Sequence, residues 1–159
     1  MHCVEGVSGQ LAELRSMPSL RVLALPASCT EREADAEAVY APTLDTLFIE
    51  RPVEHAGEWK LDLSRLTSLG NLYLDGCSTR VTETQVQAAS HLTGLRELNL
   101  DDCINVTDEG LRTLSSITAF DTLYHAGCYN VTATGKQALR DDLPNLRLHD
   151  SHTMHGLPR

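Results

Sequence analysis

The sequence predicts an α/β solenoid, in which short parallel strands and helices alternate along one continuous core. One segment, residues 95–117, changes its apolar spacing from that of a strand to that of a helix. Segments that begin in the same way recur every 23 to 26 residues. A strand and a helix this short cannot bury their apolar faces alone, so copies on either side must cover them. We therefore expect about six stacked strands.

The strand of this segment is indicated by Leu95, Leu98 and Leu100, which follow the spacing L-x-x-L-x-L. Leu98 and Leu100 share one face, because side chains alternate between the two faces of an extended chain. The opposite face carries Glu97, Asn99 and Asp101.

The helix of the segment begins after Cys103, where the apolar spacing changes. Leu111, Leu114 and Ile117 recur every three residues, as on one side of a helix. Thr107 precedes them, at a position where a hydroxyl side chain caps a helix.

The N-terminal segment resembles the second half of a repeat. Five of its residues match the 95–117 unit and its continuation at an offset of 100: Cys3, Leu11, Leu14, Met17 and Leu20. No strand is predicted before them, so we expect the domain to begin in mid-repeat, with the Leu20 strand at the edge of the sheet. Exposed edge strands pair readily with other chains, so we expect another protein to cover this edge.

The remaining units repeat the strand pattern. Strands are predicted at residues 20–25, 44–49, 69–74, 120–125 and 143–148. Two capping boxes, Thr30 with Glu33 and Thr82 with Gln85, predict helices after the 20–25 and 69–74 strands.

Two stretches interrupt or end the pattern. Pro52 and Gly57 predict an irregular insertion at about 51–62 in place of a turn and helix. Residues 149–159 are predicted to form a polar tail, which leaves 1–148 as the repeat domain.

Charge restricts the classes of partner. Thirteen Lys and Arg stand against 22 Asp and Glu, a net charge of −9. Such a surface attracts basic protein partners and disfavours nucleic acid and anionic membranes as direct ligands. No apolar run approaches the roughly 20 residues of a membrane span, and no targeting signal is visible. We expect an intracellular protein of the cytosol, the nucleus or an organelle reached without a visible signal.

The cysteines and histidines admit metal or catalytic interpretations. Four of the five cysteines share one position of the repeat and no C-x-x-C pair occurs, so buried, reduced thiols are predicted. His149, His152 and His155 have helical metal-ligand spacing, but they lie in the predicted tail, and a polar tail is the favoured interpretation. His125 occupies an inward strand position and is predicted to be a core histidine. We expect no catalytic residue, metal or cofactor.

Three phrases carry a family resemblance. C-I-N-V-T-D-E-G-L-R-T-L at 103–114, C-Y-N-V-T-A-T-G at 128–135 and C-S-T-R-V-T-E-T at 77–84 resemble the cysteine-containing leucine-rich repeat, found behind the F-box in substrate-recognition subunits of ubiquitin ligases. The resemblance implies a leucine-rich-repeat solenoid: a right-handed arc with strands on the concave side, helices on the convex side, and partners on the concave face or loops. Pro52 departs from the pattern, standing where the cysteine is expected, and no F-box-like segment precedes the repeats.

The side chains that point away from the predicted core form columns across the strands. The candidate partner-binding residues in these columns combine aromatic rings with carboxylates, as interface cores and rims do. They are Phe48, Glu50, Tyr73, Asp75, Glu97, Asn99, Asp101 and Tyr124.

The sequence therefore predicts a non-catalytic protein interaction module that binds a basic or amphipathic segment on its concave face. Two alternatives remain open. One is a structural subunit wedged into a large multiprotein or ribonucleoprotein assembly, and the other is a substrate-recognition subunit of a ubiquitin ligase.

Overall fold

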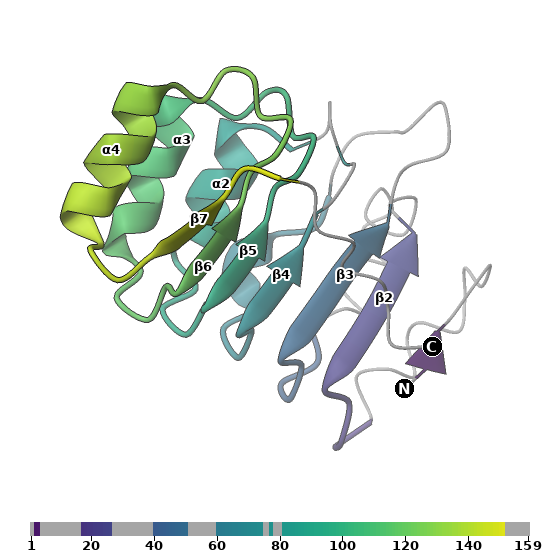
Figure 1. Ribbon diagram of the computed structural model, residues 1–159. Coiled ribbons are helices and arrows are strands. Elements are labelled where there is room, and N and C mark those ends of the chain that lie inside the picture. The colour runs from purple at the N-terminus through teal and green to yellow at the C-terminus, as the bar shows by residue number, and fades with distance from the viewer. Residues whose placement is uncertain are drawn as a thin grey trace.

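The computed structural model describes residues 2–3, 17–26, 40–50, 60–74, 77 and 81–151. Within these residues the fold is α/β and every strand pairing is parallel. Seven strands form one sheet in chain order, so each strand lies beside those that precede and follow it (Figure 1). The strands are β1 (His2–Cys3), β2 (Val22–Pro26), β3 (Thr46–Glu50), β4 (Asn71–Tyr73), β5 (Glu97–Asn99), β6 (Thr122–Tyr124) and β7 (Arg147–His149).

Neighbouring strands pair at equivalent positions of the repeat. Leu72 pairs with Leu47 on one side and with Leu98 on the other, and Leu98 pairs in turn with Leu123. All four side chains are fully buried. Residues one predicted repeat apart are thus the residues that pair across the sheet. Each of the six predicted strands is confirmed in position.

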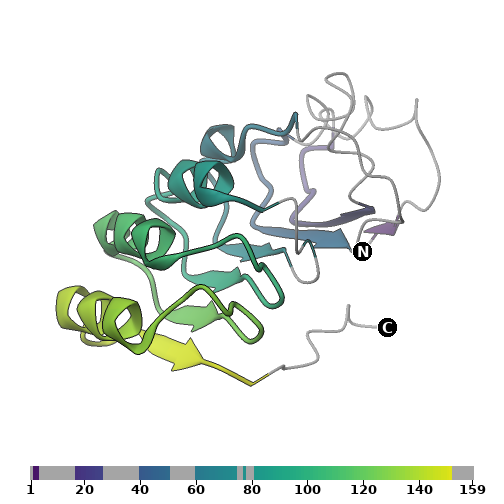
Figure 2. The ribbon, with the colours of Figure 1, turned by 90° about the horizontal axis from the view of Figure 1, so that it is seen from above.

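The helices lie along one face of the sheet. They are α2 (Glu83–Ala89), α3 (Asp108–Thr113) and α4 (Ala133–Asp142), with short 3-10 helices η3 (Leu63–Arg65) and η4 (Leu114–Ser116). Figures 1 and 2 show α2, α3 and α4 side by side behind the strands. Leucines from both layers, with Val86, Ile117 and the column cysteines, form one core cluster between them. Each helix in this described part of the chain is too short or too polar to span a bilayer.

The prediction of a missing first strand is wrong. Residues His2 and Cys3 form β1, which pairs in parallel with Leu23 and Ala24 of β2. The Leu20 strand is therefore not the edge of the sheet, and the argument for a partner that covers it falls. A strand of two residues is too short to show an alternating apolar pattern, so it could not be predicted from its own residues.

Several predicted features lie wholly or partly outside the described residues. They are the helix predicted from Thr30, the helical segment at 11–17 apart from Met17, and most of the 51–62 insertion. Of the predicted tail, His149 is the last residue of β7, and His152 and His155 lie outside the described residues.

The three column cysteines that the structure describes in full link successive units. Cys77, Cys103 and Cys128 are buried and carry free thiols, as predicted. Each thiol donates to a strand carbonyl of the unit before it, at 3.5 Å to Ile49, 3.6 Å to Leu74 and 3.1 Å to Leu100. Burial raises the pKa of the Cys128 thiol to about 12, so it stays protonated and can keep donating.

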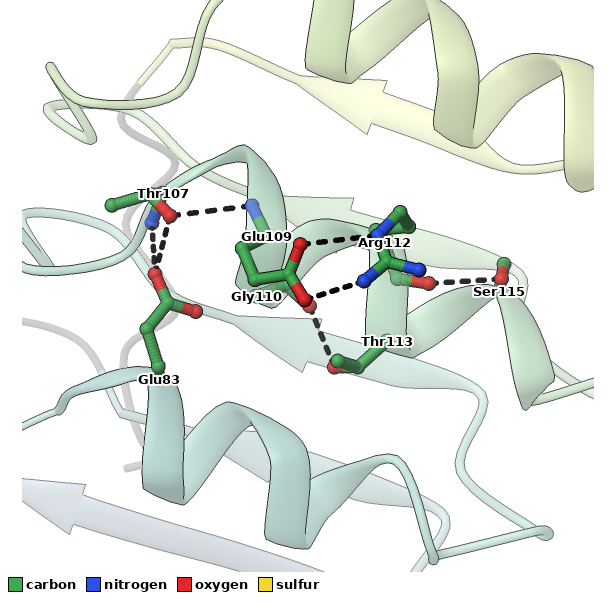
Figure 3. Close-up of polar contacts among 7 residues, drawn as sticks. All are labelled: Glu83, Thr107, Glu109, Gly110, Arg112, Thr113 and Ser115. Atoms are coloured by element: carbon green, nitrogen blue, oxygen red, sulfur yellow. Dashed lines mark hydrogen bonds and ion pairs between the residues drawn. The ribbon is translucent and has the colours of Figure 1, made fainter.

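The start of each later helix is completed by the helix before it. Glu83 in the first turn of α2 accepts hydrogen bonds from the amide and hydroxyl of Thr107, at 2.8 and 2.6 Å (Figure 3). Asp108, in α3, accepts the same pair from Thr132 at 2.7 and 2.6 Å. Both threonines are N-caps, so the carboxylate of one unit holds the cap of the next.

Glycines make room for these carboxylates. In α2 the third helical residue is Gln85, whose side chain accepts from the amide of Thr82, as the capping box predicts. The same position holds Gly110 in α3 and Gly135 in α4, and a Cβ there would lie 2.1 Å from a carboxylate oxygen of Glu83 or Asp108. In α2 the amide of the N-cap residue donates to Gln85 of the same helix. In α3 and α4 the equivalent amide donates to a carboxylate of the preceding helix instead.

Candidate binding surface on the front face of the sheet

The front face of the sheet is the face opposite α2, α3 and α4 (Figure 2). Strand pairing aligns one column of side chains across it, one residue from each strand. From β2 to β7 this column reads Ala24, Phe48, Tyr73, Asn99, Tyr124 and His149. The structure thus brings together the three aromatic residues that the sequence predicted for one surface.

Four rings in this column form two stacked pairs, which we call the aromatic row. Phe48 and Tyr73 stack with centroids 4.4 Å apart and planes 7° apart. Tyr124 stacks on His149 at 4.8 Å and 21°. All four side chains are partly exposed. Sequence reasoning missed His149 because it assigned the residue to the tail, although its spacing from Tyr124 equals one repeat.

Glu97 lies on β5, between the strands that carry the two tyrosines of the row. The Tyr73 hydroxyl donates to its Oε1 at 2.7 Å. Burial, together with this hydrogen bond and the charge of Glu97, raises the pKa of the Tyr73 hydroxyl well above its usual range. Burial and the same carboxylate also raise the pKa of Tyr124. Both tyrosines therefore stay neutral, and the carboxylate is the charged member of this group.

Asn99 and Asp101 are not the exposed side chains that strand alternation predicted. Their exposed fractions are 0% and 1%. Asn99 lies in the column between two tyrosines, whose larger side chains flank it. Its Oδ1 accepts from the Asp101 amide at 2.7 Å, and Asp101 Oδ1 accepts from the Ala126 amide at 2.7 Å. These two side chains hold backbone in place, which excludes them from first contact with a partner.

The predicted row of carboxylates is only partly placed. Glu50 is the last residue of β3, but its side chain, like the whole of Asp75, lies outside what the structure describes. With Asp101 buried, Glu97 is the one predicted carboxylate that the described residues place, partly exposed, on the front face.

Two ion pairs between units lie near the starts of the strands, and they were not predicted from the sequence. Asp45 pairs with Arg96 at 3.5 Å across Gly70, where a Cβ would come within 2.9 Å of the arginine. Asp121 pairs with Arg147 of the next unit. In the described part of the chain, no Lys or Arg lies within ion-pair distance of Glu97. Among these described carboxylates, Glu97 is therefore the one without an arginine partner.

Two apolar side chains protrude elsewhere, on the loops between strands and helices. Tyr129 is 84% exposed and Ile104 is 37% exposed. They occupy equivalent positions of adjacent units, and Asn130 Nδ2 donates to the Ile104 carbonyl at 2.7 Å. The phrases C-I-N-V-T and C-Y-N-V-T contain this signal, since both place a large apolar residue directly after the buried cysteine.

His125 is buried in the strand-end position that leucine occupies in other units, with 3% of its surface exposed, as predicted for a core histidine. Burial lowers the pKa of its imidazole below the usual range. Its own backbone and Asp150 oppose this shift, whereas Lys136 and Arg140 add to it. No group of three potential metal ligands occurs in the described ranges.

We expect His125 to make the folded state less stable as the pH falls. Its pKa is lower in the folded than in the unfolded chain, so the unfolded chain binds the proton first and stability declines below about pH 6.5. The effect is about 1.4 kcal/mol for each unit by which folding lowers the pKa. Urea unfolding at pH 7.5 and pH 5 should show a smaller pH dependence for His125→Leu. The exposed His91→Gln variant is the control, and an equal reduction in both variants would contradict the assignment.

No protein-family model matches the chain, and no curated protein matches it at a significant level.

Proposed function

We propose that this chain is a leucine-rich-repeat protein that binds another protein, without catalysis, through the front face of its sheet. The repeat assignment is supported by strands that stack in chain order with equivalent leucines in register. The recurring buried cysteine and the helices on the opposite face are also typical of the cysteine-containing subtype suggested by its sequence phrases.

The observation that carries the proposal is the aromatic row beside Glu97. Partly exposed aromatic side chains next to a charge are the composition of interface anchors. The rings are fixed by stacking and the Tyr73 hydroxyl by a hydrogen bond, so little side-chain freedom would be lost on binding.

The charge of the protein favours a basic or amphipathic partner segment. The net charge is −9, and Glu97 on the front face has no described cationic neighbour within ion-pair distance. Such a field accelerates association with a cationic surface and opposes a phosphate backbone.

Photo-crosslinking from the front face tests this function. A photoreactive phenylalanine analogue at position 48 should crosslink a binding partner in an extract of the cells that make the protein. The same analogue at Thr84, exposed on α2, is the matched control. Products from position 84 but not from position 48 would place binding on the helices and refute the proposed surface.

A structural role in a larger assembly is the second candidate. The exposed pair Ile104 and Tyr129 favours it, because a wedged subunit contacts neighbours through more than one surface. In that case the analogue at position 129 would crosslink a second protein, different from the one captured at position 48.

A further inference from the structure

We infer that Glu97, with the rings of Tyr73 and Tyr124, forms a recognition point for one arginine side chain of the partner. This inference rests on the proposed function and names the chemistry of the group that the front face selects.

The first support is the position of the carboxylate at the hydroxyl end of Tyr73, on the strand between those of the two tyrosines. Tyr73 and Tyr124 lie on the strands that flank β5, and one ring face of each is covered by its stacking partner, Phe48 or His149. The two flanking strands are about 9.6 Å apart, which is two strand spacings. In the register of the sheet Asn99 lies between the two tyrosines, and Glu97, two residues before it, accepts from the Tyr73 hydroxyl at 2.7 Å. A planar cation that bonds Glu97 therefore lies beside the Tyr73 ring.

The second support is the difference between Glu97 and the other carboxylates around it. Asp45 and Asp121 each have an arginine of another unit as partner. Glu97 accepts from the neutral Tyr73 hydroxyl instead. This bond orients the carboxylate without neutralising it, so Glu97 keeps its attraction for an external cation.

The third support is the match between this group and guanidinium rather than ammonium. A guanidinium is flat, stacks on aromatic faces and donates two parallel hydrogen bonds to a carboxylate. An ammonium is a more strongly hydrated point charge, so it loses more hydration at a half-buried site. Glu97 and both tyrosines have the intermediate exposure at which this difference matters.

Peptide selection tests the inference without a known partner. A library of random peptides displayed on phage would be selected on the immobilised full chain and eluted peptides sequenced. We expect one fixed arginine among the enriched sequences. Replacing that arginine with lysine in a synthetic peptide should weaken binding about tenfold or more, because a charge-assisted bidentate contact is lost.

Two variants of the protein separate the possible outcomes. Glu97→Gln keeps an acceptor for Tyr73 but removes the charge, and should abolish the preference for arginine while leaving the melting temperature nearly unchanged. Binders that lose affinity with Phe48→Ala but show no arginine preference, or whose preference survives Glu97→Gln, would overturn the inference and leave the proposed function standing. A selection that yields no binder sensitive to Phe48→Ala would overturn both.

Discussion

Replacing Leu98 with aspartate is expected to unfold the protein. Leu98 is fully buried at the centre of β5, in register with leucines on both neighbouring strands. The change removes a side chain whose burial contributes roughly 1.5 to 3 kcal/mol. It also forces a carboxylate into the core with no partner, which costs several kcal/mol more. Since domains are stable by only about 5 to 15 kcal/mol, circular dichroism should show no cooperative melting transition.

The matched control for this change is Val22→Asp. Val22 also lies in a strand but points to the front face, where it is partly exposed. We expect this variant to fold and to melt within a few degrees of the unmodified protein. A Leu98→Asp protein that melts as cooperatively as Val22→Asp would contradict the alternation of faces along β5.

Gly135→Ala should be strongly destabilising, although alanine is normally the better residue in a helix by about 0.5 to 1 kcal/mol. The new Cβ would lie 2.1 Å from Oδ1, 2.3 Å from Cγ and 2.8 Å from Cβ of Asp108. Asp108 is too short to move aside and keep both of its bonds to Thr132. We expect a loss of roughly 2 to 4 kcal/mol, measured by urea unfolding, and a melting temperature about 5 to 15 °C lower.

Three controls make this prediction specific. Gly94→Ala should be nearly neutral, because the nearest atom to a Cβ there, the Leu69 carbonyl oxygen, is 3.8 Å away. Gly110→Ala should cost less than Gly135→Ala, since the longer Glu83 side chain can withdraw. In an Asp108→Ala background the Gly135→Ala change should become neutral or stabilising. Additive effects of those two substitutions would show that the carboxylate is not the group that the methyl displaces.

The strands were predictable from sequence because their signal is local. The leucine spacing that recurs from Leu20 to Leu143 specifies which side chains point inward, and equal spacing specifies the register. The same reasoning placed Phe48, Tyr73 and Tyr124 in one column. It failed for β1, whose two residues carry no period.

The contacts that polar side chains make between units could not be predicted from the sequence. Alternation alone predicts that Asn99 and Asp101 are exposed, but both are buried by neighbours from other strands of the folded sheet. Glu83 looks like an ordinary acidic residue in a first helical turn, yet its partner is Thr107, 24 positions away. Hydrogen bonds over such separations leave no pattern within a single segment.

The cap contacts between successive helices all run the same way along the chain, with the acceptor in one helix and the donor at the start of the next. Each carboxylate reaches forward, from α2 to the start of α3 and from α3 to the start of α4, and Ala133 has no carboxylate to continue the series. Because each of these hydrogen bonds stabilises both of the helices that it joins, we expect α2, α3 and α4 to open together as one cooperative unit rather than one at a time.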